Sequence, residues 1–566
     1  MTNCDREEKR QNFINNQLQR TDWQSCRLAA DASSRIYYRI TTGDKNYILL
    51  DDATGTNKCD LFVRLSALLR ESGVYAPEVL AADLQNHFLL LEDFGDGTFT
   101  RLLTTENERE LYLKGTEALL AVSRVRCRPE GIGVLNEERI AADILFLLDD
   151  YYPLAAGKEI SPAYRQKFVQ LVQKLLPMAF RVPSGLVLWD YHVDNLMLLP
   201  DGNCGVLDFQ DALWGPLTYD VMSLVEDARR EVSPQVAAEM TELFFQGLKN
   251  VSREDFTASY KFMAMFRHMR VLGRFAALYV KNGKDRYLQF IPHVWKMLEQ
   301  TLLYPGLAEM RQLIDDIFPP ELRCEPQRRK VNQAFLLAAG RGVRMENLTD
   351  NCPKPLVKVG GKALIDYNFD KLAKINLRRV TVNVCYLAEQ IKTHLAGIKG
   401  FNLQISEEAE ALETGGGIKK AMPLLDGGPL LVLNSDTFWL EETGKSNLER
   451  LVEAWDDNKY DIVLLLQPLD KIIGDGGIGN YKVTDGRLRR NVDKAAEGYP
   501  YLFTGASILH PRIFAGIEAE KFSLRDLFDR AESCGRLGWV EGQGLLFHVG
   551  TPKAVDSAEN YLKDSK

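Results

Sequence analysis

The chain lacks the features that mark several large classes of protein. Its nine cysteines are scattered, and no closely spaced pair suggests a zinc or redox site. It has no basic surplus, because 70 Lys and Arg stand against 78 Asp and Glu, which argues against a general nucleic-acid binder. No uncharged apolar run approaches the length of a membrane span, and the charged amino end shows no signal peptide. We therefore expect a cytoplasmic protein with reduced thiols and with no nucleic-acid or membrane partner.

What the chain does have is length and an ordinary globular composition. Its 566 residues are too many for one hydrophobic core, so we expect more than one domain. The regular pattern breaks around 305–331, where Phe-Pro-Pro at 318–320 and a charged stretch at 325–330 are typical of a linker. We place the boundary there, which gives domains at 1–324 and 325–566.

The first domain is expected to have an α+β fold with two lobes. Apolar and β-branched runs, a turn and a helical pattern predict a small N-lobe at about 20–95. The strands and the helix that we expect in it occupy 37–40, 47–50, 61–69 and 87–91. A mostly helical C-lobe follows at about 96–310. This layout is typical of kinase-like folds.

Three polar residues in this domain form a pattern that suits phosphoryl transfer. That reaction needs an acceptor oxygen aligned with the γ-phosphate and metal ions that neutralise charge. An Asp and an Asn five residues apart on a short loop, with a second Asp after the next hairpin, meet both needs. These residues are Asp190, Asn195 and Asp208. Each alone suits a turn or a helix cap, but the three in this order favour a kinase.

This region resembles the aminoglycoside phosphotransferase superfamily, and within it the anomeric sugar kinases that act on N-acetylmuramate and N-acetylglucosamine. The resemblance covers most of 20–305. It rests on Leu-Asp-Phe-Gln-Asp at 207–211, Trp-Gly-Pro-Leu-Thr-Tyr-Asp at 214–220 and Arg-Val-Leu-Gly-Arg-Phe-Ala at 270–276. It implies that Asp190 is the catalytic base and that ATP places its adenine at a hinge. The Mg²⁺ ligands that it implies are Asn195 and Asp208, the hinge residues are Glu92 and Asp93, and Asp211 assists the metal or the loop.

The chain also departs from that family's pattern. The strand at 47–51 has no lysine where kinases usually carry one, and Lys45 lies before it in the turn. Arg35 is then a candidate for binding the nucleotide phosphates, with a solvated surface arginine as the equal alternative. Trp189 stands where many relatives have a small or basic residue. We expect His192 to be structural, and Tyr219 and Asp220 to brace the loop.

In the second domain, predicted strands and helices alternate. Such alternation is typical of an α/β fold with a parallel sheet covered on both faces. The expected elements occupy 333–338, 363–374, 380–384, 387–395 and 430–434.

A glycine-rich loop at 336–345 follows the first of these strands. Gly340 and Gly342 allow backbone amides to approach a triphosphate, and Arg341 and Arg344 supply positive charge. The loop lacks the Gly-Lys-Ser/Thr ending of a P-loop and the third glycine of a dinucleotide fingerprint. Taken alone it is therefore a weak indication of nucleotide binding.

Four further motifs follow in order, namely Pro-Lys-Pro at 353–355 and the stretches at 359–365, 412–418 and 433–436. With the loop, they resemble sugar-1-phosphate nucleotidyltransferases, particularly N-acetylmuramate-1-phosphate uridylyltransferases, over roughly 332–562. The resemblance implies a Rossmann-like fold of the GT-A type in which a sugar phosphate attacks the α-phosphorus of UTP.

The same resemblance implies roles for individual residues. Arg344 and Lys354 are the catalytic cations and Asp436 ligates Mg²⁺. The nucleotide-binding residues that it implies are Leu337, Ala338, Ala339, Gly340, Gly342 and Gly416. His548 stands where many relatives carry an Asp that provides a second ligand to the metal, and histidine suits Mg²⁺ poorly. The alternative for Lys354 is a solvated loop lysine, and the alternative for Asp436 is a turn residue at the end of a strand.

The two signatures together lead to one hypothesis. The first half phosphorylates the anomeric hydroxyl of N-acetylmuramate or N-acetylglucosamine with ATP, and the second half makes a UDP-sugar from the product, in cell-wall sugar salvage. Nothing in the sequence implies an obligate protein partner. A choline kinase joined to a phosphocholine cytidylyltransferase and a non-catalytic sensor of sugars or nucleotides remain the alternatives.

Overall fold

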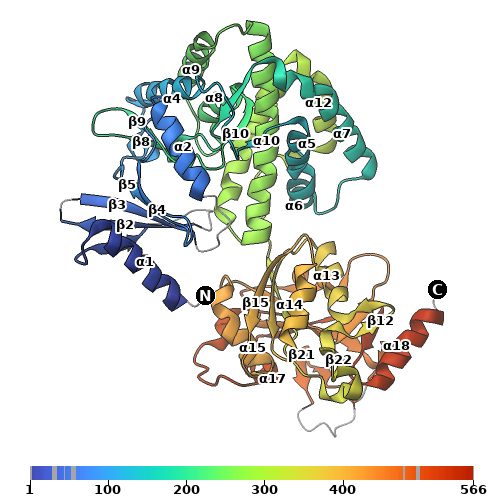
Figure 1. Ribbon diagram of the computed structural model, residues 1–566. Helices are drawn as coiled ribbons and strands as arrows, with labels where there is room; N and C mark the ends of the chain where they lie inside the picture. Colours follow the sequence, from blue (N-terminus) through green and yellow to red (C-terminus); the bar gives the residue numbers. More distant parts are fainter. Residues whose placement is uncertain are drawn as a thin grey trace. The chain divides into compact units, whose positions relative to one another are not determined.

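The computed structural model describes residues 3–28, 35–43, 45–52, 59–475, 478–491 and 498–564. The chain divides into two compact units (Figure 1). The first unit contains residues 1–274 and 289–325, and the second unit contains 275–288 and 326–566. The long helix α10 (Arg253–Asn282) begins in the first unit, and its last residues belong to the second.

The amino-terminal part of the first unit is a five-stranded sheet in the order β1-β2-β3-β5-β4. Its bounds are β1 (Gln24–Arg27), β2 (Ile36–Thr42), β3 (Lys45–Asp51), β4 (Val79–Asp83) and β5 (Phe88–Glu92). Strands β2 and β3 form the predicted hairpin, and α2 (Cys59–Glu71) is the predicted helix. Helix α1 (Asn3–Leu18) packs Phe13 and Ile14 against Ile40, Leu49 and Phe88 of the sheet.

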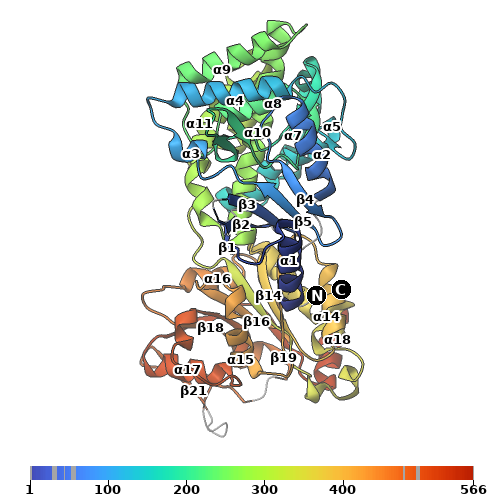
Figure 2. The same ribbon diagram turned by 60° about the vertical axis from the view of Figure 1, so that its left-hand side comes forward.

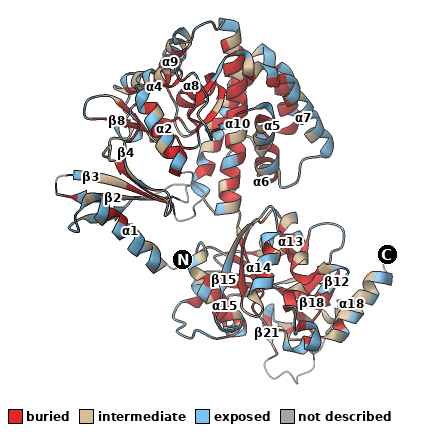
Figure 3. Cartoon of the chain, in the orientation of Figure 1, coloured by how far each residue is buried: buried red, intermediate tan, exposed pale blue. Residues whose placement is uncertain are grey.

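The rest of the first unit is mainly helical. Its principal helices are α3 (Phe99–Leu102), α4 (Glu108–Val122), α5 (Glu137–Asp143), α6 (Tyr152–Ala156), α7 (Pro162–Leu175), α8 (Thr218–Val225), α9 (Pro234–Gly247), α10, α11 (Ile291–Leu302) and α12 (Ala308–Ile317). Most of α10 is buried among the other helices (Figure 3). The short strands β6 (Gly133–Val134), β7 (Ser184–Val187), β8 (Leu196–Leu198), β9 (Cys204–Val206) and β10 (Leu213–Pro216) interrupt the helices.

The predicted break at 305–331 is wrong in its first half. Residues 308–317 form α12, because Met310, Leu313, Ile314 and Ile317 recur at helical spacing and are buried. Phe318 continues that packing, with its ring 5.2 Å from the ring of Trp295. The two prolines that follow end the helix, and residues 325–330 form no helix or strand.

The second unit is built on a mixed sheet with the order β15-β14-β11-β16-β22-β18-β23. Figure 2 labels β14, β16 and β18 of this sheet. Its bounds are β11 (Gln333–Leu337), β14 (Arg379–Val384), β15 (Asn402–Glu407), β16 (Leu430–Asn434), β18 (Ile462–Pro468), β22 (Tyr501–Leu509) and β23 (Leu537–Glu541). The first four are parallel as predicted, but β22 is antiparallel to both neighbours. Only the short strands β19 (Ile472–Gly474), β20 (Tyr481–Thr484) and β21 (Arg487–Arg490) and a 3-10 turn lie between β18 and β22 in the described residues. No crossover helix there returns the chain to the starting edge, so β22 runs antiparallel.

Helices cover both faces of this sheet. On β11, Leu336 packs toward α13 (Leu364–Lys374), α14 (Ala388–Ala396) and α16 (Asn447–Ala454). Its neighbour Phe335 packs toward α15 (Glu413–Ala421) and α17 (Leu524–Ser533), because successive strand residues point to opposite faces.

A second, smaller sheet completes the unit. It has the order β17-β24-β19, and α18 (Pro552–Asp564) packs beside it. The bounds of its other strands are β17 (Thr437–Leu440) and β24 (Leu545–His548). A further pair of short strands, β12 (Lys358–Val359) and β13 (Lys362–Ala363), precedes α13. Throughout the described residues, no helix combines the length and apolar character that a membrane crossing requires.

Candidate active sites

The buried side chain of Asp220 fixes the loop that carries Asp190. Asp220, in the first turn of α8, accepts hydrogen bonds from the backbone N–H groups of Leu188 at 2.6 Å and Trp189 at 3.0 Å. Burial raises the pKa of Asp220 from an ordinary 3.8 to about 7, although the two N–H donors oppose that rise. Asp220 therefore braces the loop, as we expected from the sequence.

Trp189 fixes the backbone conformation next to Asp190. Its φ of 77° lies in the left-handed region, which costs free energy for a bulky residue. The indole stacks on Tyr219 at 4.7 Å between ring centroids, and the guanidinium of Arg270 lies 4.4 Å from the same ring. These contacts stabilise the strained turn and place an arginine beside the site.

Asp190 is exposed to solvent, but many protein atoms surround its carboxyl group. Desolvation raises its pKa, while the charges of Arg270, Arg267 and Arg229 oppose the rise. Asp208 adds to the rise as a nearby like charge. A carboxylate with a raised pKa is a stronger base, which suits the removal of a proton from a hydroxyl.

The predicted metal ligands lie around this loop. Asn195 donates its side-chain N–H to the Asp190 carbonyl at 2.8 Å, which leaves its amide oxygen for a cation. Asp208 adopts a φ of 57° and accepts from Gln210 at 2.6 Å and Arg35 at 3.4 Å. Arg35 also pairs with Asp211 at 3.3 Å. Oxygen donors of this kind suit Mg²⁺.

Arg35 and the hinge acids meet different surroundings. Only 6% of the Arg35 side chain is exposed, so Arg35 is not a solvated surface arginine. Residues 29–34, which precede it, lie outside the described part of the chain. Glu92 accepts from the Glu78 N–H at 3.1 Å, and Asp93 pairs with Arg39 at 2.6 Å. Because both carboxylates have partners within the protein, an adenine there would meet the main chain.

In the second unit, a pocket of about 210 Å³ opens at the carboxyl ends of β11 and β16. Ligand sites in open α/β sheets lie at such ends. Of the predicted nucleotide-binding and catalytic residues, those that line it are Leu337, Ala339, Gly340, Gly342, Lys354 and Asp436.

Two predicted nucleotide-binding residues do not line this pocket. Ala338 is buried and donates its N–H to the Asn383 side chain at 2.8 Å. Gly416 lies inside α15, where a Cβ would come within 2.1 Å of the Glu520 carbonyl oxygen. The glycine permits close packing there, which is a structural reason for its presence.

Lys354 and Asp436 form the centre of the pocket. Lys354 donates a hydrogen bond to Asp436 Oδ2 at 2.7 Å, and Asp436 Oδ1 is buried with no partner in the described chain. Burial opposes ionisation of Asp436, but Lys354, His548 and Arg344 together lower its pKa. The orphaned Oδ1 is an ionised oxygen suited to a hard cation such as Mg²⁺.

His548 has a defined orientation beside this pair. Its Nδ1 lies 2.8 Å from the carbonyl oxygen of Asp475, and because a carbonyl only accepts, Nδ1 carries the proton. Within the described residues, the Nε2 atom makes no hydrogen bond. The Asp475 carboxylate accepts from Thr551 at 2.9 Å, and it lies close to Arg344 around Gly550.

Two polar residues of the pocket wall, Asn383 and Glu408, lie outside the motifs found in the sequence. Asn383, at the end of β14, donates to Glu408 at 2.6 Å while it accepts from Ala338. Glu413 opens α15 with a φ of 62°, a strained conformation that often marks a functional site. The position of Asn383 at a strand end was a usable signal, because neighbouring parallel strands end at one edge.

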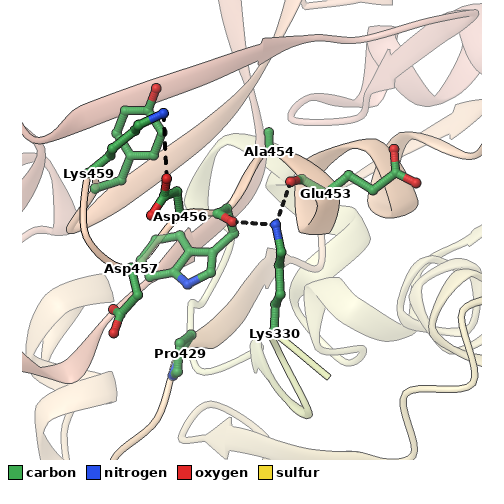
Figure 4. A pocket seen from close by; sticks show the side chains of 9 residues that line it. Lys330, Pro429, Glu453, Ala454, Asp456, Asp457 and Lys459 are labelled. Carbon is green, nitrogen blue, oxygen red and sulfur yellow. Dashed lines mark hydrogen bonds and ion pairs between the residues drawn. The ribbon is translucent and has the colours of Figure 1, made fainter. Parts of the chain in front are cut away.

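A second hollow in this unit lies at the amino ends of β11 and β16, where Lys330 and Pro429 precede the strands (Figure 4). Lys330 donates to the carbonyls of Glu453 at 2.9 Å and Trp455 at 2.8 Å. Lys459 pairs with Asp456 at 3.5 Å. Its charged groups are thus engaged within the protein, and this end of the sheet is opposite the candidate site.

Comparisons with known proteins match the two parts of the chain to two different families. A phosphotransferase enzyme family matches residues 25–252, and a nucleotidyl transferase family matches residues 333–470. Over 295 residues the chain is 35% identical to an N-acetylmuramate/N-acetylglucosamine kinase of Pseudomonas aeruginosa, covering 50% of this chain and 86% of that protein.

Two relatives from Caulobacter vibrioides match different activities. The chain is 38% identical over 237 residues to its N-acetylmuramate alpha-1-phosphate uridylyltransferase, covering 41% of this chain and 97% of that protein. It is 29% identical over 345 residues to its N-acetylmuramate/N-acetylglucosamine kinase, covering 52% of this chain and 92% of that protein. In that organism the two relatives are separate proteins.

Proposed function

We propose a bifunctional enzyme, because the chain belongs to two families: the N-acetylmuramate/N-acetylglucosamine kinases and the N-acetylmuramate alpha-1-phosphate uridylyltransferases. The first unit transfers the γ-phosphoryl group of ATP to the anomeric hydroxyl of N-acetylmuramate or N-acetylglucosamine. The second unit transfers a uridylyl group from UTP to the resulting sugar 1-phosphate. Two consecutive steps of cell-wall sugar recycling, in the cytoplasm, then share one chain.

In the kinase step, Asp190 takes the proton of the anomeric hydroxyl as its oxygen bonds to the γ-phosphorus and ADP leaves. The raised pKa of Asp190 and its exposed face support this role. Asn195 and Asp208 are the residues that would hold Mg²⁺, which supplies neutralising charge on the phosphates. Arg35 forms ion pairs with Asp208 and Asp211, and it takes the place of the missing strand lysine in binding the nucleotide phosphates.

In the uridylyl step, the sugar phosphate oxygen bonds to the α-phosphorus of UTP and pyrophosphate leaves. Lys354 and Arg344 stabilise the charge that develops on the phosphate oxygens. Gly340 and Gly342 allow the backbone to approach the triphosphate, and Asp436 would hold Mg²⁺. The observation that carries this assignment is the Lys354–Asp436 pair with its unpartnered Asp436 Oδ1 inside the pocket.

The choline alternative is disfavoured by the surroundings of Trp189. An aromatic cage for a quaternary ammonium needs open aromatic faces and no competing cation. Trp189 instead stacks on Tyr219 and lies under the guanidinium of Arg270. A positively charged substrate would be repelled from this wall of the site.

The decisive experiment supplies the purified chain with N-acetylmuramate, ATP, UTP and Mg²⁺ and identifies the products by mass spectrometry. We expect a UDP-linked sugar. Asp190→Asn should stop formation of the sugar 1-phosphate, whereas Asp436→Asn should let it accumulate. Asp201→Asn and Asp485→Asn, at exposed turns of the two units, are the matched controls. A wild-type chain that forms neither product contradicts the proposal, and it would then leave the sensor alternative.

A further inference from the structure

One face of α10 carries arginines that the proposed chemistry does not use. Arg267, Arg270 and Arg274 are spaced by three and four residues, so their side chains leave the helix on the same side. The charges of Arg270 and Arg267 act on Asp190, and Asp190 acts on Arg274. This face of the helix therefore lies beside the catalytic carboxylate.

Arg270 is held in place but its donors stay open. Its guanidinium lies 4.4 Å from the Trp189 ring, and its Nε is 3.4 Å from a carboxylate oxygen of Asp143. The Nε atom is nevertheless buried and makes no hydrogen bond within the described chain. Only 17% of the side chain is exposed, so the group is fixed before any ligand arrives.

Gly273 brings this part of α10 close to a neighbouring turn. A Cβ at Gly273 would lie 2.2 Å from the carbonyl carbon and oxygen of Phe146. Phe146 directly precedes a π-helical turn, η1 (Leu147–Tyr151), a rare conformation that recurs at functional sites. The close approach leaves the Phe146 ring 5.4 Å from the guanidinium of Arg274.

Arg274 is exposed, and it forms no hydrogen bond and no ion pair with the described residues. Desolvation lowers its pKa, and the charge of Arg270 lowers it further, while Asp150, Asp143 and Asp190 oppose this. Two neighbouring guanidinium groups with open donors favour a planar anion, since each presents a fork that matches a carboxylate.

We propose that Arg270 and Arg274 bind the lactyl carboxylate of N-acetylmuramate and thereby select this acidic sugar over neutral N-acetylglucosamine. The inference rests on the proposed kinase function. Both sugars offer the same anomeric hydroxyl to Asp190, and they differ by the ether-linked lactate on O3. Arg35 pairs with Asp208 and Asp211 on the metal side, so we assign the acceptor to the arginines of α10 and not to Arg35.

Arg274→Gln is the primary test, because this exposed side chain makes no hydrogen bond with the described part of the chain that the substitution would remove. Kinase rates are measured against N-acetylmuramate, its neutral methyl ester, N-acetylglucosamine and ATP. We expect the KM for N-acetylmuramate to rise at least about tenfold, and the KM values for N-acetylglucosamine and ATP to stay within about twofold. The KM of Arg274→Lys for N-acetylmuramate should lie between the values for the wild type and Arg274→Gln, because lysine keeps the charge but lacks the forked pair of donors.

Arg253→Gln is the matched control, since Arg253 lies at the other end of α10 and pairs with Glu242. In the wild type, the methyl ester should behave like N-acetylglucosamine. Equal losses with both sugars, no loss with either, or a selective rise in the KM for ATP would each overturn the assignment. If the wild type phosphorylates neither sugar, the proposed kinase function itself is overturned. If the wild type phosphorylates both sugars and Arg274→Gln leaves the KM for N-acetylmuramate unchanged, only this inference is overturned.

Discussion

Lys354 and Asp436 meet at 2.7 Å although they are 82 residues apart in the chain. Lys354 comes from a short turn after the glycine-rich loop, and Asp436 follows β16. The pair places a cation and a carboxylate with one free oxygen in the same pocket. That combination suits the nucleotidyl transfer that we propose, because Asp436 would hold a metal ion and Lys354 would neutralise phosphate charge.

Replacement of Lys354 by methionine should disable the second activity and leave the first intact. The loss of a cation aimed at developing phosphate charge costs a factor on the order of a hundred or more in kcat. Uridylyl transfer is measured as pyrophosphate release from UTP and sugar 1-phosphate, and kinase activity as ADP release. Lys358→Met, at an exposed position nearby, should change neither rate. Unchanged pyrophosphate release in Lys354→Met would contradict the role given to this residue.

Gly342→Ala should act on the same pocket through the backbone. Gly342 has a φ of 70°, and a Cβ there would lie 2.9 Å from side-chain carbons of Lys354. We expect uridylyl transfer to fall at least about tenfold as Lys354 is displaced, a loss on the order of 1.4 kcal/mol in transition-state binding. Gly361→Ala carries a similar strain, with a φ of 79°, but meets nothing within 4 Å. If the two variants lose equal activity, strain rather than the Lys354 contact is responsible.

Asp220→Asn should change how the stability of the first unit depends on pH. The folded carboxyl has a pKa of about 7 against an ordinary 3.8, so the folded state binds the proton more tightly. Its stabilising contribution is complete below pH 3.8 and is lost as the pH rises through about 7. The difference in Tm between wild type and Asp220→Asn should therefore be larger at pH 5 than at pH 8. A difference that stays constant, measured by thermal unfolding in matched buffers, would show that Asp220 does not titrate in this range.

Tyr151→Phe should destabilise the first unit without altering its chemistry. The buried Tyr151 hydroxyl donates to the Leu322 carbonyl and accepts from Trp295 at 2.9 Å. Its removal leaves buried polar groups without a partner, at a cost of about 1–3 kcal/mol. Urea unfolding should show this loss. The control is Tyr164→Phe, whose hydroxyl makes no hydrogen bond with the described residues and which should unfold like the wild type.

Local patterns were good guides to individual elements. The hairpin of β2 and β3 and the strand β16 lie where alternation and apolar runs predicted them. The direction of β22 and the helix α12 were missed for different reasons. Strand direction depends on how the chain crosses the sheet, which no single run of residues records. The spacing of Met310 and Ile314 indicated a helix, but the prediction gave more weight to the prolines that follow and placed a break there.

The sequence by itself determined the chemistry of this protein. Asp190, Asn195 and Asp208 lie on one loop and one hairpin, so turn geometry alone brings them together. The tertiary structure decided what surrounds that chemistry. The charges of Arg270 and Arg274 act near Asp190 because of the packing of α10, and Asp436 meets Lys354 through the order of strands in a sheet. Contacts of that kind depend on which apolar faces are buried together, a property of the whole fold rather than of a short stretch of sequence.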